Sequence, residues 1–252
     1  MKYSQRPKYE RRNETIAVLV MILLCIPVLF IYFSFFANAF ILDSTGELTL
    51  QNFQFLYQPI QLSQYTVEPI GKAFRNTVIF TAIATTLEVT ISCMAGYALA
   101  RMEFTGKRVI SFSLLTLRLF PGVLYVLLHL GILNTLTGVI VVAIALRLPG
   151  STFIIRNFFA GIPQDIENSA LVDGCNRLTA FFQVIIHMVK PGLASISIFA
   201  FMSAWSNYLL FNVLIFNTKT PVLATYLRVL SRNDQMIADY GVFAAMAMVY
   251  ML

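Results

Sequence analysis

Long apolar runs separated by polar segments are the main feature of this chain of 252 residues. A helix of about 20 apolar residues is long enough to cross a hydrocarbon core of about 30 Å. Five such runs cover residues 16–42, 74–100, 109–132, 136–159 and 191–216. A sixth run, 240–252, would make only about 20 Å of helix. We therefore expect the printed sequence to stop inside the last of about six transmembrane helices.

The apolar runs predict an all-α polytopic membrane protein surrounded by lipid. Lipid offers the backbone no hydrogen-bond partners, so only helices and closed barrels can span it. The strands of a barrel alternate polar and apolar residues, and these runs do not. Composition supports the prediction, because 58% of the residues are hydrophobic and 12% are charged. That charged fraction is about half of what soluble domains carry.

The polar segments suggest how the chain is organised. A basic segment, 1–15, precedes the first apolar run. That run is too long for a signal peptide and lacks a clear small-residue cleavage site, so we expect it to remain as the first transmembrane helix, 16–42. A mixed polar loop, 43–73, follows and is expected outside the cytoplasm. Residues 74–252 then form the predicted core, with helices two to six and a long polar loop at 160–190.

The distribution of Lys and Arg indicates the orientation in the membrane. Basic residues collect in short cytoplasmic loops. If the N-terminus is cytoplasmic, that side carries Lys2, Arg6, Lys8, Arg11, Arg12, Arg101, Lys107, Arg108, Arg156, Arg177 and Lys190, and the other carries Lys72, Arg75, Lys219, Arg228 and Arg232. This bias places the loop at 160–190 in the cytoplasm. It also accounts for the net charge of +6 without a nucleic-acid partner.

The polar loop at 160–190 contains the pattern of a short helix. Pro163 suits the first turn, where its missing N–H costs nothing. Asp165 and Glu167 would follow in that turn, favourably placed for the helix dipole. Gly174 suits the left-handed residue that ends a helix. A helix of two to three turns is unstable alone in water, so we expect it to pack against a partner.

The stretch 167–174, Glu-Asn-Ser-Ala-Leu-Val-Asp-Gly, resembles the EAA loop of the permease subunits of binding-protein-dependent ABC importers. The pattern of that family is roughly Glu-Ala-Ala, two residues and Asp-Gly, followed by an aromatic residue and a proline. The residues that fall where the pattern places them are Ala170, Asp173, Gly174, Phe181 and Pro191.

The resemblance implies that this helix couples the membrane helices to an ATP-binding subunit. In the family the short helix sits in a groove of that subunit and transmits its ATP-driven closure. The small residues Ser169 and Ala170 would allow a close approach to the groove. The implied coupling residues are Glu167, Asn168, Ser169, Ala170, Asp173, Gly174, Phe181 and Pro191.

One position departs from the family pattern in a way that affects docking. Asn168 stands where the motif has its glutamate, with Glu167 one residue earlier. Asn can donate and accept hydrogen bonds but carries no charge. Glu167 could substitute for that glutamate, although one residue rotates the side chain by about 100° around a helix. The resemblance therefore implies docking here without specifying an ion pair to the partner.

Further short segments, in the same order, are similar to the permease subunits of maltose and related oligosaccharide importers. They lie at residues 75–77, 95–101, 120–122, 133–135 and 156–159. The resemblance implies the smaller, six-helix permease of a type I importer, in the inner membrane of a bacterium or archaeon. The implied partners are a second permease subunit, two ATP-binding subunits and an extracytoplasmic solute-binding protein. ATP and Mg²⁺ would be bound by the partner ATPase and not by this chain.

Three charged residues lie inside predicted transmembrane helices: Glu88, Arg118 and Arg147. Each costs at least about 2.5–3.5 kcal/mol to insert, so such groups usually face a cavity or pair with each other. In one interpretation they line the translocation path, and the surplus arginine favours an anionic solute such as an acidic saccharide or a glycerol phosphate. In the other, Glu88 and one arginine form a structural pair.

An aromatic and amide group, Trp205, Asn207 and Tyr208, offers the stacking surfaces and hydrogen bonds that sugar sites use. Such a group inside a span also serves helix packing, so both interpretations stay open. The sequence contains no Gly-rich phosphate loop followed by Lys and Ser or Thr, and no spacing typical of a metal site. We therefore expect no catalytic residues, no bound metal and no ATP on this chain.

Two other classes of protein remain open. An ATP-independent secondary transporter could use Glu88 as a proton site, and its uptake would collapse with the proton gradient. We find no internal inverted repeat of the kind that many such transporters have. A membrane scaffold or sensor could use the loop at 160–190 to dock a signalling partner, and it would show no solute-dependent ATPase activity.

Overall fold

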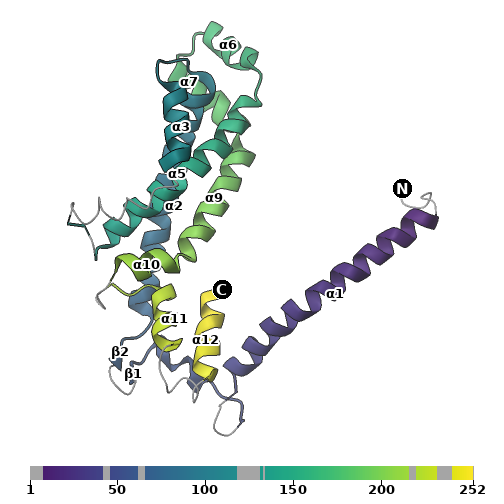
Figure 1. Ribbon diagram of the computed structural model, residues 1–252, viewed down its shortest axis with the longest axis vertical. Helices are drawn as coiled ribbons and strands as arrows, with labels where there is room; N and C mark the ends of the chain where they lie inside the picture. Colours follow the sequence, from purple (N-terminus) through teal and green to yellow (C-terminus); the bar gives the residue numbers. More distant parts are fainter. Residues whose placement is uncertain are drawn as a thin grey trace. The chain divides into compact units, whose positions relative to one another are not determined.

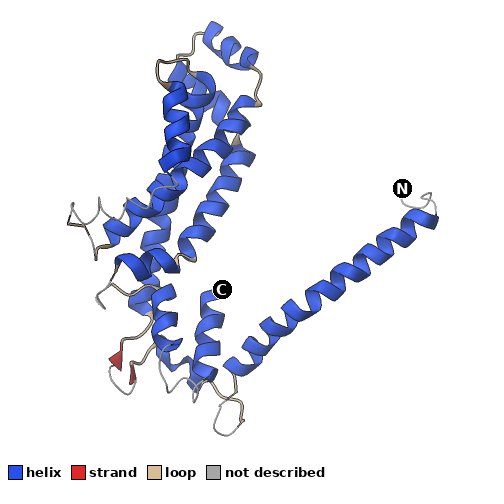
Figure 2. Ribbon diagram, in the orientation of Figure 1, coloured by secondary structure: helices blue, strands red, loops and turns tan. Residues whose placement is uncertain are grey.

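The computed structural model shows a protein built almost entirely of α-helices, which confirms the predicted fold class (Figures 1 and 2). It describes residues 8–41, 46–61, 66–117, 131–132, 134–215, 220–231 and 240–251. The described strands are the two-residue β1 (Ile60–Gln61) and β2 (Thr66–Val67), which pair antiparallel. The chain divides into two compact units, one of Met1–Gly71 with Leu227–Leu252 and one of Lys72–Tyr226.

In the first unit, the first apolar run forms α1 (Lys8–Ala39) and the last forms α12 (Tyr240–Met251). α12 packs against the C-terminal part of α1, where the ring of Phe35 lies 6.3 Å from the rings of both Tyr240 and Phe243. The side chains from residue 16 to residue 33 are exposed in this chain. Because most of them are apolar, this part of α1 is suited to contact with lipid or with another membrane protein.

The C-terminal end of α1 is held by a buried asparagine of the short 3-10 helix η1 (Gln51–Leu56). Asn52 Nδ2 donates hydrogen bonds to the carbonyl oxygens of Ala39, at 3.1 Å, and Ile41, at 2.8 Å. Carbonyls at the end of a helix lack partners within the helix, so Asn52 supplies the missing donor. Gly241 leaves room for this side chain, because a Cβ there would lie 2.4 Å from Asn52 Nδ2.

Asn52→Ala is expected to lower the free energy of unfolding by about 1–3 kcal/mol, because buried carbonyls lose their donor. The measurement is the thermal unfolding midpoint of the purified protein in detergent, followed by circular dichroism. Gln54→Ala, at an exposed position of the same short helix, is the matched control and should leave the midpoint unchanged. Equal midpoints for the wild type and Asn52→Ala would contradict this role of Asn52.

The second unit is built around three long helices, α2 (Gly71–Arg101), α5 (Leu136–Ala160) and α9 (Lys190–Trp205). Two glycines bring these helices close together. A Cβ on Gly96 of α2 would lie 2.5 Å from Ile155 Cγ2, and one on Gly192 of α9 would lie 2.5 Å from the ring of Phe158. α5 therefore contacts both α2 and α9 at positions where only a hydrogen fits, a common device in membrane helix packing.

Two apolar clusters lie along these helices. The first joins α2 and α5 to α10 (Tyr208–Leu214), and in it the rings of Phe80 and Phe211 meet edge to face at 4.8 Å. The second joins α2, α5 and α9 to the π-helix η2 (Phe181–Ile185). The polar residues Glu88 and Arg147 fall between these clusters along α2 and α5, so a buried polar layer separates the two apolar regions.

Among the described residues, three helices are long and apolar enough to cross a membrane: Glu14–Ala39, Gly71–Arg101 and Leu136–Ala160. A fourth candidate is the pair Arg177–Met188 and Lys190–Trp205, which is bent by 78°. The predicted third span is described only in part. Its first residues form α3 (Lys107–Leu117), and residues 118–130 lie outside the described residues.

The predicted fifth span, 191–216, is not one helix. α9 ends at Trp205, and α10 begins two residues after Ser206. Asn207 ends the run because its side-chain Oδ1 accepts a hydrogen bond from the backbone N–H of Leu210, at 3.3 Å. Because Asn207 is the N-cap of α10, a new helix begins there and α9 does not continue. The uninterrupted apolar pattern concealed this break.

The segment between the fifth and sixth apolar runs contains a helix that the sequence did not predict, α11 (Leu223–Ser231). Two hydrogen bonds to α2 hold its first turn. Asn76 Nδ2 donates to the carbonyl of Pro221 at 2.9 Å, and the backbone N–H of Leu223 donates to Thr77 Oγ1 at 2.9 Å. These partners are far apart in the sequence, so no local pattern could reveal them.

Candidate functional site

The predicted short helix of the polar loop is α6 (Gln164–Val172), at one end of the second unit (Figure 1). It begins directly after Pro163 and carries two acidic residues in its first turn, as expected. Gly174 has a φ of 90°, the left-handed conformation that ends a helix. The N–H of Cys175 bonds the carbonyl of Ala170 at 3.1 Å, and the N–H of Gly174 bonds that of Leu171 at 3.2 Å. The sequence therefore predicted both ends of α6 correctly.

The inner face of α6 is bound to the end of α2. Glu167 is only 7% exposed, and its Oε1 accepts a hydrogen bond of 2.6 Å from the hydroxyl of Tyr97. Arg101, the last residue of α2, places its Nε 3.5 Å from Glu167 Oε2. Its Nη2 donates to the carbonyl of Ile162 at 2.6 Å, just before the turn at Pro163. One arginine therefore holds both sides of the turn that leads into α6.

An aromatic cluster supports this contact. The ring of Tyr97 lies 4.6 Å from that of Phe181 and 5.6 Å from that of Phe159. Phe181 is buried at the start of η2, which follows α7 (Arg177–Ala180) and leads through α8 (Ile186–Met188) to the bend before α9. The motif phenylalanine therefore acts by packing beneath α6, inside this chain.

The outer face of α6 is exposed in the part of the chain that the structure describes. Asn168, Ser169, Asp173 and Gly174 are exposed, and Val172 is 86% exposed. Leu178 and Phe182, in the two helices that follow, are 69% and 60% exposed.

The implied coupling residues therefore divide into an exposed group and a buried group. Asn168, Ser169, Asp173, Gly174 and Pro191 are exposed, whereas Glu167, Ala170 and Phe181 are buried within this chain. The expectation that Ala170 faces a partner was wrong, because only 8% of it is exposed. It lies one turn from Glu167 and so shares the inner face.

The intramembrane carboxylate Glu88 is buried between α2 and α5. Ser151 Oγ donates to Glu88 Oε1 at 2.6 Å, and Arg147 Nε lies 3.3 Å from Glu88 Oε2. This second contact is an ion pair without hydrogen-bond alignment, because the Nε–H donates to the carbonyl of Ala143 at 3.1 Å. Arg147 Nη1 also reaches the carbonyl of Ala200 on α9, at 3.4 Å.

The arrangement matches the structural interpretation of this pair, in which one arginine compensates Glu88. Arg118, the other candidate, lies outside the described residues. The hydroxyls of Thr81, Thr85 and Ser92 are buried on the same face of α2 as Glu88 and have no hydrogen-bond partner among the described residues. This face is therefore polar over three turns in the middle of a span.

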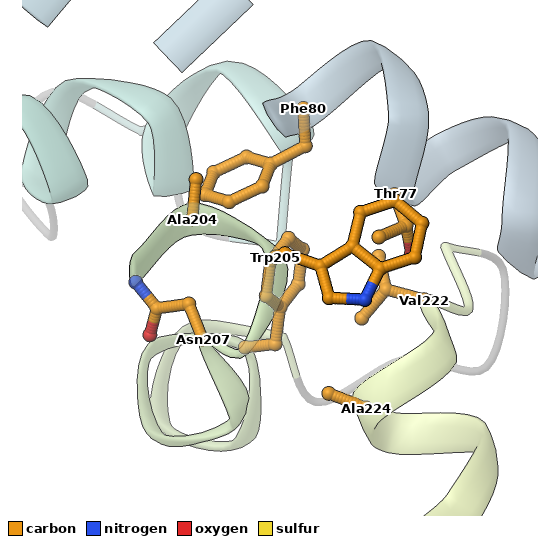
Figure 3. Close-up of a pocket in the computed structure, with 8 residues that line it drawn as sticks. Thr77, Phe80, Ala204, Trp205, Asn207, Val222 and Ala224 are labelled. Atoms are coloured by element: carbon orange, nitrogen blue, oxygen red, sulfur yellow. The ribbon is translucent and has the colours of Figure 1, made fainter. Parts of the chain in front are cut away.

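Two members of the third candidate group, Trp205 and Asn207, line a small pocket, shown in Figure 3. Trp205 stacks on Phe201, with ring centroids 5.9 Å apart, and meets Phe74 edge to face at 6.4 Å. Asn207 caps α10, and Tyr208 is the first residue of that helix. The empty volume is about 160 Å³, including space open to the surface. Ligand pockets usually hold about 300–1,000 Å³, so this one is too small for a sugar chain.

Comparison with known families identifies the chain. The family described as the binding-protein-dependent transport system inner membrane component matches residues 88–252. This chain belongs to that family. Its members are transport permeases and not enzymes. The matched part of the permease begins at Glu88 and includes α5, α6 and α9.

Relatives of the permease serve carbohydrate transport. The permease protein NgcG of the diacetylchitobiose uptake system of Streptomyces coelicolor is 32% identical over 244 residues, which are 92% of this chain and 78% of that protein. MdxG, a permease protein of the maltodextrin transport system of Bacillus subtilis, is 28% identical over 204 residues, which are 78% of this chain and 70% of that protein. The permease is therefore of the carbohydrate ABC importer type.

A solved structure confirms the fold of the permease. A chain in the crystal structure of a bacterial ABC transporter involved in the import of the acidic polysaccharide alginate superposes with a TM-score of 0.79. The match covers 98% of this chain and 93% of that chain, at 18% identity. The type I permease fold predicted from the sequence is thus confirmed.

Three residues of the two polar contacts had no role in the sequence analysis: Tyr97, Arg101 and Ser151. Tyr97 and Arg101 were noted as part of a family segment, and their spacing places both on one face of α2 at its end. That spacing was the available signal for a shared partner. Ser151 gave none, because a serine in an apolar helix usually bonds its own backbone.

Glu88→Leu is expected to destabilise the permease by about 3–5 kcal/mol, because it leaves the guanidinium of Arg147 buried without its counter-charge. The double variant Glu88→Leu/Arg147→Met removes both charges and should recover most of that loss. The measurement is the thermal unfolding midpoint in detergent.

The matched control is Glu103→Leu, which breaks an exposed ion pair of 2.9 Å with Lys107. Exposed pairs are worth less than about 1 kcal/mol, so its midpoint should barely move. A Glu88→Leu permease with the wild-type midpoint and an altered choice of solute would instead favour the translocation-path interpretation.

Proposed function

We propose that the permease forms half of a translocation path for an oligosaccharide or a related polar solute, and that α6 couples this path to ATP hydrolysis on a partner subunit. The observation that carries the proposal is the division of α6 into an inner face bound to α2 and an exposed outer face. A push on the outer face would move α6 together with the membrane helix that holds it, as alternating access requires.

The outer face of α6 has the chemistry of a docking surface. Ser169 is small, Asn168 can donate and accept hydrogen bonds, and Val172 and Leu178 add exposed apolar area. Because Asn168 is neutral where the family pattern has a glutamate, docking here would depend on shape and hydrogen bonds. Glu167 cannot supply the missing charge to a partner, since its carboxylate is buried and occupied.

The proposed assembly contains a second permease subunit, two ATP-binding subunits that carry ATP and Mg²⁺, and an extracytoplasmic solute-binding protein. The dependence on a binding protein follows from the family. The exposed apolar side chains of α1 offer a large surface to lipid or to the second permease. The Lys and Arg distribution supports a cytoplasmic N-terminus, which would put α6 on the side where ATP is available.

The charges of the described membrane helices favour an uncharged solute. Among the described residues, Glu88 and Arg147 compensate each other's charge, so this pair leaves no surplus positive charge to attract an anion. The same pairing speaks against Glu88 as the proton site of a secondary transporter, because Ser151 donates a hydrogen bond to Glu88 Oε1 and Arg147 forms an ion pair with Oε2. A neutral saccharide fits this charge compensation best.

Ser169→Trp is expected to abolish ATP-dependent uptake, because an indole on the outer face of α6 would keep the helix out of its groove. Membrane insertion should be normal, since Ser169 is exposed and only its hydroxyl bonds the carbonyl of Asp165. The measurements are co-purification of the ATP-binding subunit in mild detergent and uptake by vesicles that contain the assembled complex.

Thr105→Trp is the matched control, because Thr105 is exposed in the turn between α2 and α3, which is predicted to lie on the same side of the membrane. It should retain both the ATP-binding subunit and uptake. A Ser169→Trp permease that binds its ATPase and transports as well as the control would contradict coupling through this face.

The solute class is tested by uptake of a panel of labelled neutral and acidic oligosaccharides into the same vesicles, with the binding protein present. We expect neutral oligosaccharides to enter only when ATP is supplied, and acidic ones to enter at least about tenfold more slowly. Uptake driven by a proton gradient in the absence of ATP would contradict the proposal.

A further inference from the structure

We propose that Glu167, Tyr97 and Arg101 form a latch that makes α6 and the end of α2 move as one piece, so that these three are positioning residues for coupling. This inference rests on the proposed function, because it concerns how the push on α6 reaches the membrane helices. The contacts are the hydrogen bond of 2.6 Å from Tyr97 to Glu167 and the ion pair of 3.5 Å between Arg101 and Glu167.

The latch spans the turn at Pro163 between α5 and α6. Arg101 donates a hydrogen bond to the carbonyl of Ile162 on one side of Pro163 and forms an ion pair with the carboxylate of Glu167 on the other. Without these bonds, the turn at Pro163 could rotate α6 relative to α2, because proline supplies no N–H to fix it. With them, the direction of α6 is set by a side chain that belongs to α2.

The latch is buried, and burial makes its free energy depend strongly on the position of α6. The side chains of Arg101 and Glu167 are 4% and 9% exposed. A charge in such surroundings is costly unless its partners stay in place, so a small displacement of α6 would be opposed. Ala170, on the same face, is buried and apolar, and apolar contacts have no preferred direction. The directional contacts between α6 and α2 are therefore those of Glu167.

In this chain, attachment of α6 to the membrane helices and contact with the ATP-binding subunit belong to different residues of the EAA loop. A glutamate that touched the ATP-binding subunit would need an exposed carboxylate, and that of Glu167 is turned inward. Contact with the partner then falls to the exposed neighbours Asn168 and Ser169 on the outer face. The inner residues hold the helix, and the outer residues receive the push.

The test uses the complete complex, with its partner subunits and binding protein, reconstituted in vesicles. Two conservative variants address the latch. Glu167→Gln keeps the size of the side chain and removes its charge, and Tyr97→Phe keeps the ring against Phe181 and removes only the hydroxyl. Tyr57→Phe, at the exposed residue that directly follows η1, is the matched control for loss of a tyrosine hydroxyl. The readouts are the amount of assembled complex, ATP hydrolysis and solute uptake, from which the solute moved per ATP is calculated.

We expect Glu167→Gln to assemble normally and still hydrolyse ATP, but to move about tenfold less solute per ATP, because a charge-assisted contact is lost. Tyr97→Phe should show a severalfold loss, and Tyr57→Phe none. The double variant Tyr97→Phe/Glu167→Gln should be no worse than Glu167→Gln alone, because both act through the same link.

Three outcomes would overturn the latch. They are wild-type solute per ATP in both variants, an additive loss in the double variant, and a loss of assembled complex with unchanged solute per ATP, which would make the contact purely structural. A wild-type complex that moves no solute would overturn the proposed function itself. Because that result concerns the wild type, it is distinguishable from failure of the latch.

Discussion

The buried carboxylate of Glu167 is the interaction on which the arrangement of the candidate site depends. It accepts a hydrogen bond from Tyr97 and faces Arg101, both on the last turns of α2. Since a buried charge is costly without these partners, the contact fixes which face of α6 turns inward. The exposed positions of Asn168, Ser169 and Val172 then follow from the geometry of a helix. One buried contact thus determines the surface that a partner can meet.

The same constraint operates in the middle of the second unit. Glu88 lies between two apolar clusters and is tolerated there because Arg147 compensates its charge and Ser151 donates a hydrogen bond to it. α2 therefore carries one compensated carboxylate contact in its middle and another at its end. The first holds α5, and the second holds the turn into α6. Gly96 and Gly192 allow α2 and α9 to pack closely against α5. The polar and the apolar contacts therefore favour the same packing of these helices.

Local sequence patterns predicted the features that depend on local physics. Apolar length identified the long helices, and proline, acidic residues and glycine located both ends of α6. The local patterns did not predict features that depend on contacts between residues far apart in the sequence. The inward direction of Glu167 depends on Tyr97, 70 positions away, and the helix α11 is held by Asn76 and Thr77 of α2. The break at Asn207 was missed because an apolar run conceals a cap whose signal is a single side chain.

The most direct test of the central claim is a cryo-electron microscopy structure of the permease in its native membrane complex. It should show Glu167 within hydrogen-bond distance of Tyr97, as in the isolated chain, and Asn168, Ser169 and Val172 covered by an ATP-binding subunit. A complex in which Glu167 turns outward to pair with a basic residue of that subunit would contradict the account. So would a complex in which the outer face of α6 remains exposed to solvent.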